Sequence, residues 1–194
     1  MERKTILIDI DDTILHDYEL PFINKFLGTT HTYADFEYPG AYVQDIFKDY
    51  PATKKEEFYD FFFTQDMYGD SIIKIKPDAI EVIKKLCERH DVYFCSDFTI
   101  WQRPWQSDKA FVDKFQMLKR HFPFLSPFQH IYIKKKCLLH ADVLIDDRPY
   151  NFGPHIKQKL LFTTYHNKNL PEQELAEKKL IRINSWAEIA KLLL

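Results

Sequence analysis

One stretch near the start of the chain limits what the protein can fold into. Residues 5–8, Thr-Ile-Leu-Ile, are mostly apolar and run directly into a segment that carries Asp9, Asp11 and Asp12. An apolar run with this ending is typical of a buried parallel strand whose carboxyl end opens into a loop. Side chains alternate along a strand, so Asp9 and Asp11 can point the same way. Open α/β sheets bind ligands at this end of their strands, although an acidic turn after an edge strand would give the same pattern.

A second copy of this pattern lies at residues 141–149. A short apolar run ends there in Asp146 and Asp147, and the following Arg148 and Pro149 stop the strand. Two buried strands that release carboxylates at the same end concentrate negative charge, which is costly unless a cation lies there. Mg2+ prefers oxygen ligands, which it usually takes from both protein carboxylates and substrate phosphate. The two motifs together therefore predict a Mg2+ and phosphate site.

Length, charge and cysteine content narrow the class of protein. A chain of 194 residues can form one domain with an insertion or two small domains. Its net charge of -2 gives no general electrostatic reason to bind polymeric nucleic acid or an anionic membrane, and it has no long apolar segment or signal peptide. Three cysteines without metal-type spacing fit a reduced, cytoplasmic setting. We expect a cytoplasmic enzyme or binding protein that is a monomer or a homodimer.

Apolar runs and helical periodicities alternate along the rest of the chain. Further strands are predicted at residues 92–95, 131–133, 160–162 and 180–183. Helical patterns begin at Pro77 and Asp78, at Ser107 or Asp108, and at Ser185. This alternation predicts an α/β fold, a three-layer, doubly wound parallel sheet of the Rossmann type.

Residues 17–76 interrupt this alternation. A helical pattern ends at Gly28, residues 33–50 are rich in aromatics without a period, and Phe58, Phe61 and Phe62 lie on one face of a second helical pattern. A mainly helical insert after the first strand is placed to act as a lid over the site. We therefore predict a core of residues 1–16 and 77–194 with a cap of residues 17–76.

Four polar residues follow other predicted strands or begin the next helix. The hydroxyl of Ser96 could donate to a phosphate oxygen, although it could equally cap a turn. Lys109 lies in the first turn of a helix, where the dipole disfavours a cation unless an anion pairs with it; without the neighbouring motifs it would be a solvated lysine. Lys134 and Lys136 alternate onto one side and could lean toward substrate, or protect a sheet edge.

The order of these motifs resembles the haloacid dehalogenase (HAD) superfamily of phosphohydrolases. The resemblance is carried by residues 9–13, Ser96, Lys109 and the pair Asp146-Asp147. Residues 141–149, 161–167 and 184–186 also resemble the 5'(3')-deoxyribonucleotidase family. This closer resemblance is strong over the last third of the chain and weak across the insert.

The HAD resemblance implies a role for each acidic residue. Asp9 is expected to attack phosphorus and form an aspartyl-phosphate, and Asp11 to protonate the leaving oxygen and then activate water. The carboxylates of Asp9 and Asp146 and the backbone carbonyl of Asp11 are expected to hold Mg2+, with Asp147 supporting the ion or reaching it through water.

The resemblance also implies substrate contacts. Ser96 and Lys109 are expected to bind the transferring phosphoryl oxygens. By position, Lys134 and Lys136 match basic residues of the deoxyribonucleotidases that hold the substrate phosphate. Asp17 and Tyr18 resemble that family's acid-aromatic pair, displaced by one residue, and Tyr18 is a candidate to stack on a base.

Three positions depart from the pattern of the resembled family. Asp12 stands where glycine is common, with little expected effect beyond loop stiffness. Asp97 stands where a second hydroxyl residue is expected and adds a negative charge near the phosphate, which weakens the substrate assignment more than the chemistry. Lys134 replaces an arginine, so that a point charge replaces a bidentate fork.

We therefore expect a Mg2+-dependent phosphomonoesterase that acts on (deoxy)nucleoside monophosphates beneath a helical cap. One alternative keeps this chemistry on a phosphosugar or another small phosphate ester. An alternative of a different class is a catalytically silent domain that binds a nucleotide or a protein. Intact Asp9, Asp11, Lys109 and Asp146 argue against the silent domain, because a binding module gains nothing from a nucleophile.

Overall fold

The structure is a computed structural model that describes residues 2–16 and 18–194. Asp17, the acidic member of the pair with Tyr18 and the first residue of the predicted cap, lies outside the described residues. No described helix has the length and apolar content that a bilayer crossing needs.

Six parallel strands form one sheet in the order β3-β2-β1-β4-β5-β6. The strands are β1 (Thr5–Ile8), β2 (Asp91–Ser96), β3 (His130–Tyr132), β4 (Ala141–Asp146), β5 (Ile156–Phe162) and β6 (Leu180–Ile183). Each predicted strand is present, and the doubly wound parallel fold is confirmed. Buried side chains on both faces explain why these strands read as continuous apolar runs.

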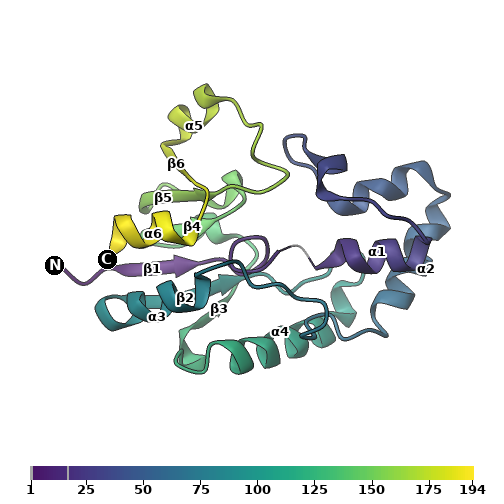
Figure 1. Ribbon diagram of the computed structural model, residues 1–194, viewed down its shortest axis with the longest axis horizontal. Helices are drawn as coiled ribbons and strands as arrows, with labels where there is room; N and C mark the ends of the chain where they lie inside the picture. The colour runs from purple at the N-terminus through teal and green to yellow at the C-terminus, as the bar shows by residue number, and fades with distance from the viewer. Residues whose placement is uncertain (1, 17) are drawn as a thin grey trace.

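Helices lie on both sides of the sheet (Figure 1). On one face, α3 (Ala79–Arg89) and α6 (Trp186–Leu193) pack against each other and share a core with Ile6 and Ile8 of β1. Leu161 of β5 points to the opposite face and packs against Leu175 of α5 (Glu172–Lys178). The long helix α4 (Asp108–His121) follows β2 and buries Ala110, Met117 and Leu118.

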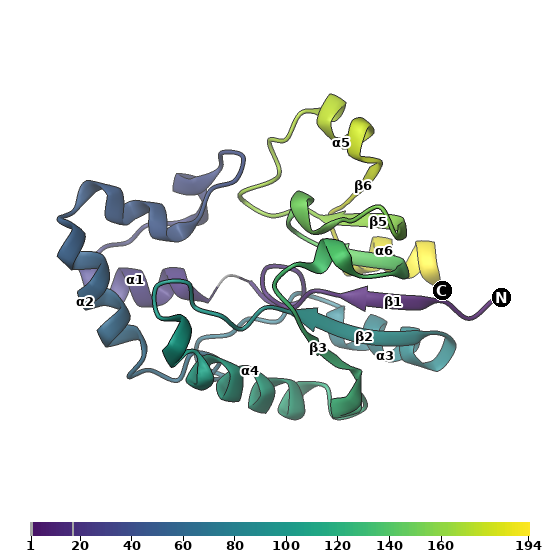
Figure 2. The same cartoon turned by 180° about the vertical axis from the view of Figure 1, so that it is seen from behind.

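The segment between β1 and α3 forms a separate group of helices beyond the carboxyl end of β1, as both ribbon views show (Figures 1 and 2). It contains α1 (Glu19–Leu27), α2 (Ala52–Phe62) and two 3-10 helices, η1 (Tyr33–Phe36) and η2 (Val43–Asp49). Helix α1 ends at Gly28, whose φ of 67° is left-handed and favours glycine. Phe58 contacts the rings of Phe26, Phe47 and Phe62, and these aromatics of the insert belong to the same buried cluster as the apolar side chains of β1.

The two chain segments that connect the insert to the core lie side by side. Leu15 and Ile75 form an antiparallel bridge. The His16 N–H donates to the Lys74 carbonyl at 2.9 Å, and the Lys76 N–H donates to the Ile14 carbonyl at 2.8 Å. Two connections held side by side in this way fix the position of the insert over the strand ends.

The order in which strands are added to the sheet changes side between β1 and β4. Strands β2 and β3 lie on one side of β1, and β4, β5 and β6 lie on the other. Ile8 pairs with Ile145, and the Asp9 N–H donates to the Ile145 carbonyl at 2.9 Å. The first residue beyond β1 therefore lies beside the last residue of β4, which is Asp146. Ligands of doubly wound sheets bind at this switch point, and both acidic motifs of the chain meet there.

Candidate active site

Three buried carboxylates meet at the switch point. One oxygen each of Asp9, Asp146 and Asp147 lies within 4.8 Å of the others. Asp9 follows β1 and Asp146 ends β4, so the pairing of these strands brings the carboxylates together. The structure thus assembles the first and last acidic motifs into one cluster, as expected from the sequence.

The ammonium group of Lys136 lies between two of these carboxylates. Its Nζ is 2.5 Å from Asp9 Oδ1 and 2.8 Å from Asp146 Oδ2, and all three side chains are buried. Burial lowers the pKa of Lys136, but Asp146 and Asp9 outweigh burial and raise its pKa well above the usual value. Lys136 is therefore held in its charged form between these two carboxylates, and its contact with substrate stays a prediction.

Asp147 has its own partners, and one of them was not predicted. His166 Nε2 is 2.5 Å from Asp147 Oδ2 and 2.8 Å from Thr164 Oγ1, and the Arg148 Nε lies 3.3 Å from the same Asp147 oxygen. Burial raises the pKa of Asp147, but His166 and then Arg148 more than offset this and hold it well below the usual range. His166 lies within the 161–167 stretch that resembles the deoxyribonucleotidases, which was the available signal.

The donor set of this cluster fits a Mg2+ ion. Burial raises the pKa of Asp9 and of Asp146, despite the opposing charge of Lys136. Neighbouring carboxylates add to this effect, since Asp147 raises the pKa of both. Ionised carboxylates that are buried close together lose their hydration and repel one another, and a cation between them offsets this cost. Mg2+ prefers hard oxygen donors of this kind.

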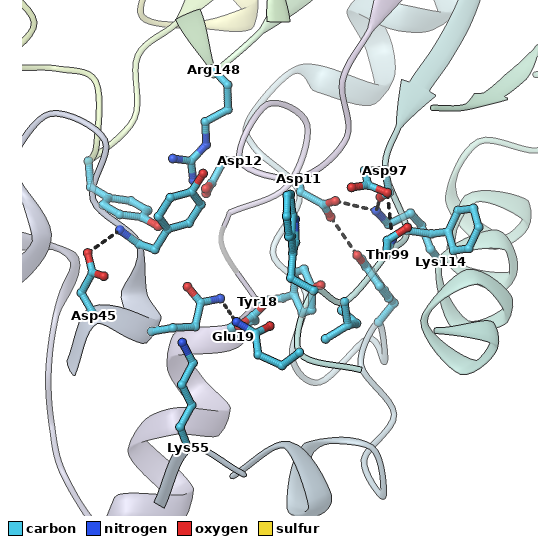
Figure 3. Close-up of a pocket in the computed structure, with 18 residues that line it drawn as sticks. Asp11, Asp12, Tyr18, Glu19, Asp45, Lys55, Asp97, Thr99, Lys114 and Arg148 are labelled. Atoms are coloured by element: carbon cyan, nitrogen blue, oxygen red, sulfur yellow. Dashed lines mark hydrogen bonds and ion pairs between the residues drawn. The ribbon is translucent and has the colours of Figure 1, made fainter. Parts of the chain in front are cut away.

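Asp11 is not among these three carboxylates, and its own carboxylate contacts three donors. Figure 3 shows Asp11 and Lys114 facing each other, and the Lys114 Nζ donates to Asp11 Oδ2 at 2.5 Å. The Tyr68 hydroxyl donates to Asp11 Oδ1 at 2.9 Å, and Ser96 Oγ donates to Asp11 Oδ2 at 3.4 Å. Lys114 Nζ also donates to Ser96 Oγ at 2.9 Å and to the Asp97 carbonyl at 2.6 Å.

The structure does not bring Lys109 to this group. Its Nζ pairs with Asp113 at 2.7 Å on the same helix, whereas Lys114 reaches Asp11 and Ser96. Both lysines lie on α4, and five residues correspond to a rotation of about 140° around a helix. The two side chains therefore leave the helix on different faces. The order of motifs pointed to Lys109, whereas Lys114 lies in a helical stretch that carries no motif.

Lys134 lies at the edge of the site and neutralises Asp97. Its Nζ is 2.8 Å from Asp97 Oδ2 and 4.1 Å from the centre of the Trp101 ring. Burial raises the pKa of Asp97, but hydrogen bonds from Lys134 and from the Thr99 N–H hold it below the usual value. The additional negative charge that the sequence placed beside Ser96 is therefore paired.

Asp12 adopts a backbone conformation that favours glycine. Its φ is 59°, in the left-handed region, which explains why glycine is common at this position in the resembled family. Its carbonyl accepts a hydrogen bond from the Lys76 ammonium, at the junction of insert and core. Its carboxylate lies 3.8 Å from His166 Nε2, so Asp12 extends the charged network rather than only stiffening the loop.

A cavity of about 470 Å3 lies between the insert and the strand ends (Figure 3). Its walls include Asp11, Lys114, Trp101, Tyr18 and Glu19. The Tyr18 ring is packed 4.5 Å from the ring of Tyr68, centre to centre. A smaller cavity of about 160 Å3 adjoins the carboxylates and is lined by residues that include Asp9, Lys134 and Lys136.

Glu19 gives a prediction that concerns stability alone. Burial raises its pKa to about 7, a hydrogen bond from Gln44 opposes the shift, and the charge of Asp11 adds to it. The folded state therefore binds more protons than the unfolded state between about pH 4.5 and pH 7, and the free energy of unfolding falls as pH rises through this window. Glu19→Gln should remove this loss and raise the free energy of unfolding by about 2–3 kcal/mol above pH 7.

Urea denaturation of both proteins at acidic and alkaline pH measures this effect. The advantage of the Glu19→Gln variant should be present at about pH 8 and shrink toward zero near pH 4.5. An advantage that does not change with pH would show that Glu19 does not titrate in this window.

Comparison with known proteins identifies the fold and the family of the chain. A protein-family model described as "5' nucleotidase, deoxy (Pyrimidine), cytosolic type C protein" matches residues 3–194. The fold is that of the HAD hydrolases: a haloacid dehalogenase-like hydrolase from Streptococcus pneumoniae superposes with a TM-score of 0.53 at 15% identity, over 99% of both chains. Within that fold, the chain belongs to the cytosolic 5'-deoxynucleotidase family that the family model defines.

Several relatives of the chain carry a nucleotidase name. The 5'(3')-deoxyribonucleotidase of Bacillus subtilis is 28% identical over 99% of both chains. A Staphylococcus aureus protein that bears the same name provisionally is 32% identical over 117 residues, which are 60% of this chain and 58% of the relative. The match thus spans just over half the length of the S. aureus protein.

Proposed function

We propose that the protein is a Mg2+-dependent phosphomonoesterase that dephosphorylates (deoxy)nucleoside monophosphates. The observation that carries this proposal is the arrangement of Asp9 and Asp11. Asp9 lies among the carboxylates and Lys136, while Asp11, two residues away, lies beside the larger cavity. This arrangement supports a role for Asp9 at a cation site and for Asp11 beside the leaving group.

The proposed chemistry has two steps. In the first, an oxygen of Asp9 forms a bond to phosphorus, the ester P–O bond breaks, and Asp11 gives its proton to the leaving oxygen. In the second, Asp11 takes a proton from a water molecule as the water oxygen bonds to phosphorus, and the bond between phosphorus and Asp9 breaks. When bound by Asp9, Asp146, Asp147 and the Asp11 carbonyl, Mg2+ supplies positive charge that offsets the phosphoryl oxygens.

The positive groups around Asp9 are proposed to bind the phosphoryl oxygens. Lys136 and Lys134 line the smaller cavity with Asp9, and Ser96 lies at the end of β2 beside Lys114. Lys114 takes the role that the sequence analysis gave to Lys109, because Lys114 is the lysine that contacts Ser96. Fixed positive charges of this kind supply most of the rate in phosphoryl transfer.

The larger cavity supports a nucleoside as the leaving group. Its volume of about 470 Å3 lies in the range of small-molecule sites, and its walls mix aromatic and polar side chains. Tyr18 lies in this wall, which keeps it a candidate for contact with the base. We propose that residues 17–76 act as the cap that closes this cavity over the substrate and sets selectivity.

The experiment that tests this function is phosphate release from a substrate panel. We expect turnover of 5' or 3' deoxy- and ribonucleoside monophosphates with Mg2+, and loss of turnover when EDTA removes the metal. Turnover of phosphosugars alone would retain the mechanism and discard the substrate class. No release from any member of the panel by folded, Mg2+-loaded protein would contradict the proposal and favour the silent binding domain.

A further inference from the structure

Tyr68 belongs to none of the sequence motifs, yet it touches the proposed acid-base residue. Its hydroxyl donates to Asp11 Oδ1 at 2.9 Å, and its side chain is almost fully buried. The ring packs against Tyr18 on one side, and the Lys114 Nζ lies 5.4 Å from the ring centre. Tyr68 therefore comes from the end of the insert but forms part of the wall around Asp11.

The segment that carries Tyr68 is anchored to helix α4. The Met67 N–H donates to Asp113 Oδ2 at 3.2 Å, directly before Tyr68. Arg120 donates to the Tyr68 carbonyl at 2.9 Å and to Asp70 Oδ1 at 3.2 Å. Contacts before and after Tyr68 thus fix its backbone to the same helix that carries Lys114.

This arrangement gives Lys109 a different role from the one expected. Lys109 pairs with the Asp113 oxygen that also accepts from Met67, so it helps to hold the Tyr68 segment in place. Helix α4 therefore carries one donor of Asp11, Lys114, and anchors a second, Tyr68, through Asp113 and Arg120.

The three donors of Asp11 act on different oxygens. Tyr68 binds Oδ1, while Lys114 and Ser96 bind Oδ2. A carboxylate bound through one oxygen can still turn about its Cβ–Cγ bond, whereas a donor on each oxygen fixes its plane. Proton transfer needs this orientation, because a misplacement of about 1 Å can cost about 100-fold in rate.

We propose that Tyr68 is a positioning residue that orients Asp11 for protonation of the leaving oxygen. This proposal rests on the proposed function, in which Asp11 is the acid and base. The core supplies the nucleophile, but the orientation of the acid depends on a side chain from the end of the insert. A chain with the insert displaced would keep Asp9 and Lys136 and lose this orientation.

The test is the dependence of Tyr68→Phe on the leaving group. A nucleoside leaves as an alkoxide and needs a proton, whereas p-nitrophenol leaves readily as the phenolate. The parameter kcat/KM reports the first phosphoryl transfer, in which the leaving group departs. Tyr68→Phe should lower kcat/KM by about 10- to 100-fold for a nucleoside monophosphate and by less than about 3-fold for p-nitrophenyl phosphate.

Three further variants define what the result means. Asp11→Asn should show the same selectivity with a larger loss. Asp113→Ala, which frees the Met67 N–H while keeping Tyr68, should show it with a smaller loss. Tyr59→Phe removes the hydroxyl of another buried tyrosine of the insert, on α2, and should leave kcat/KM unchanged for both substrates.

The outcomes separate the proposal from the function on which it rests. Equal losses of Tyr68→Phe on both esters, or no loss on either while Asp11→Asn remains selective, would overturn the role of Tyr68 and leave the function intact. A wild-type protein that releases phosphate from neither ester would overturn the function itself.

Discussion

Asp9→Asn is expected to lower phosphate release by at least about 10,000-fold on every substrate that the wild-type protein accepts. An amide oxygen is a poor nucleophile and carries no charge, so the bond to phosphorus cannot form at a useful rate. The loss should appear equally for nucleoside monophosphates and p-nitrophenyl phosphate, because both need the same attacking oxygen. This lack of selectivity distinguishes Asp9 from Tyr68.

The fold should survive this substitution. Burial raises the pKa of Asp9 despite the charge of Lys136, which means that burying the ionised carboxylate costs free energy. Burying a neutral amide of the same shape should cost no more. Lys136 keeps its partner Asp146 at 2.8 Å in this variant, so no ammonium group is left buried without a carboxylate, and urea denaturation should show little or no loss of stability. Asp142→Asn is the matched control, since Asp142 lies at the opposite end of β4 and pairs with the exposed Lys157. Full turnover by Asp9→Asn would contradict the proposed chemistry.

The fold could be predicted because its signals are local. Each strand of the sheet is a short apolar run with a clear stop, and Gly28 and Ser185 mark helix ends as expected. Alternation of strands and helices then leaves few topologies. Residues 33–50 gave no period because they form two 3-10 helices joined by turns, whose buried side chains follow no regular spacing.

The site could be predicted only where it is tied to strand ends. The sheet brings together Asp9, which follows β1, and two residues that end the neighbours of β1. These are Ser96 at the end of β2 and Asp146 at the end of β4. Lys114 and Tyr68 reach Asp11 through the orientation of α4 and of the segment docked on it, which no local pattern records. His166 lay in a motif but was assigned no role, because its partner is nineteen positions earlier at Asp147.

The site also shows how the chain tolerates its departures from the family pattern. Asp97 and Asp12 each add an acidic side chain to an already acidic site, and each has a positive or polar neighbour. Lys134 pairs with Asp97, while His166 lies near the Asp12 carboxylate. Asp147 also has partners of its own, His166 and Arg148, whereas Asp9 and Asp146 share the single ammonium group of Lys136. One lysine lies between two of these three carboxylates, which is where a divalent cation has most to contribute.

Lys136→Met should test that balance directly. Without Mg2+, the substitution leaves Asp9 and Asp146 buried without their ammonium partner, and breaking a buried ion pair in this way costs about 3–5 kcal/mol. With Mg2+, the bound dication supplies the missing charge, so the variant should gain more stability from the metal than the wild-type protein does. Urea denaturation in EDTA and in excess Mg2+ gives the four free energies of unfolding that this comparison needs.

Lys157→Met provides the control for removing a lysine from an ion pair. Lys157 pairs with Asp142 at 2.6 Å, but its side chain is 79% exposed, so its loss should change the free energy of unfolding little, with or without Mg2+. A small cost for Lys136→Met as well would mean that Asp9 and Asp146 stay neutral in the folded protein. A large cost that Mg2+ does not reduce would mean that these carboxylates do not hold the ion. The proposed metal site requires both a large cost and its partial recovery.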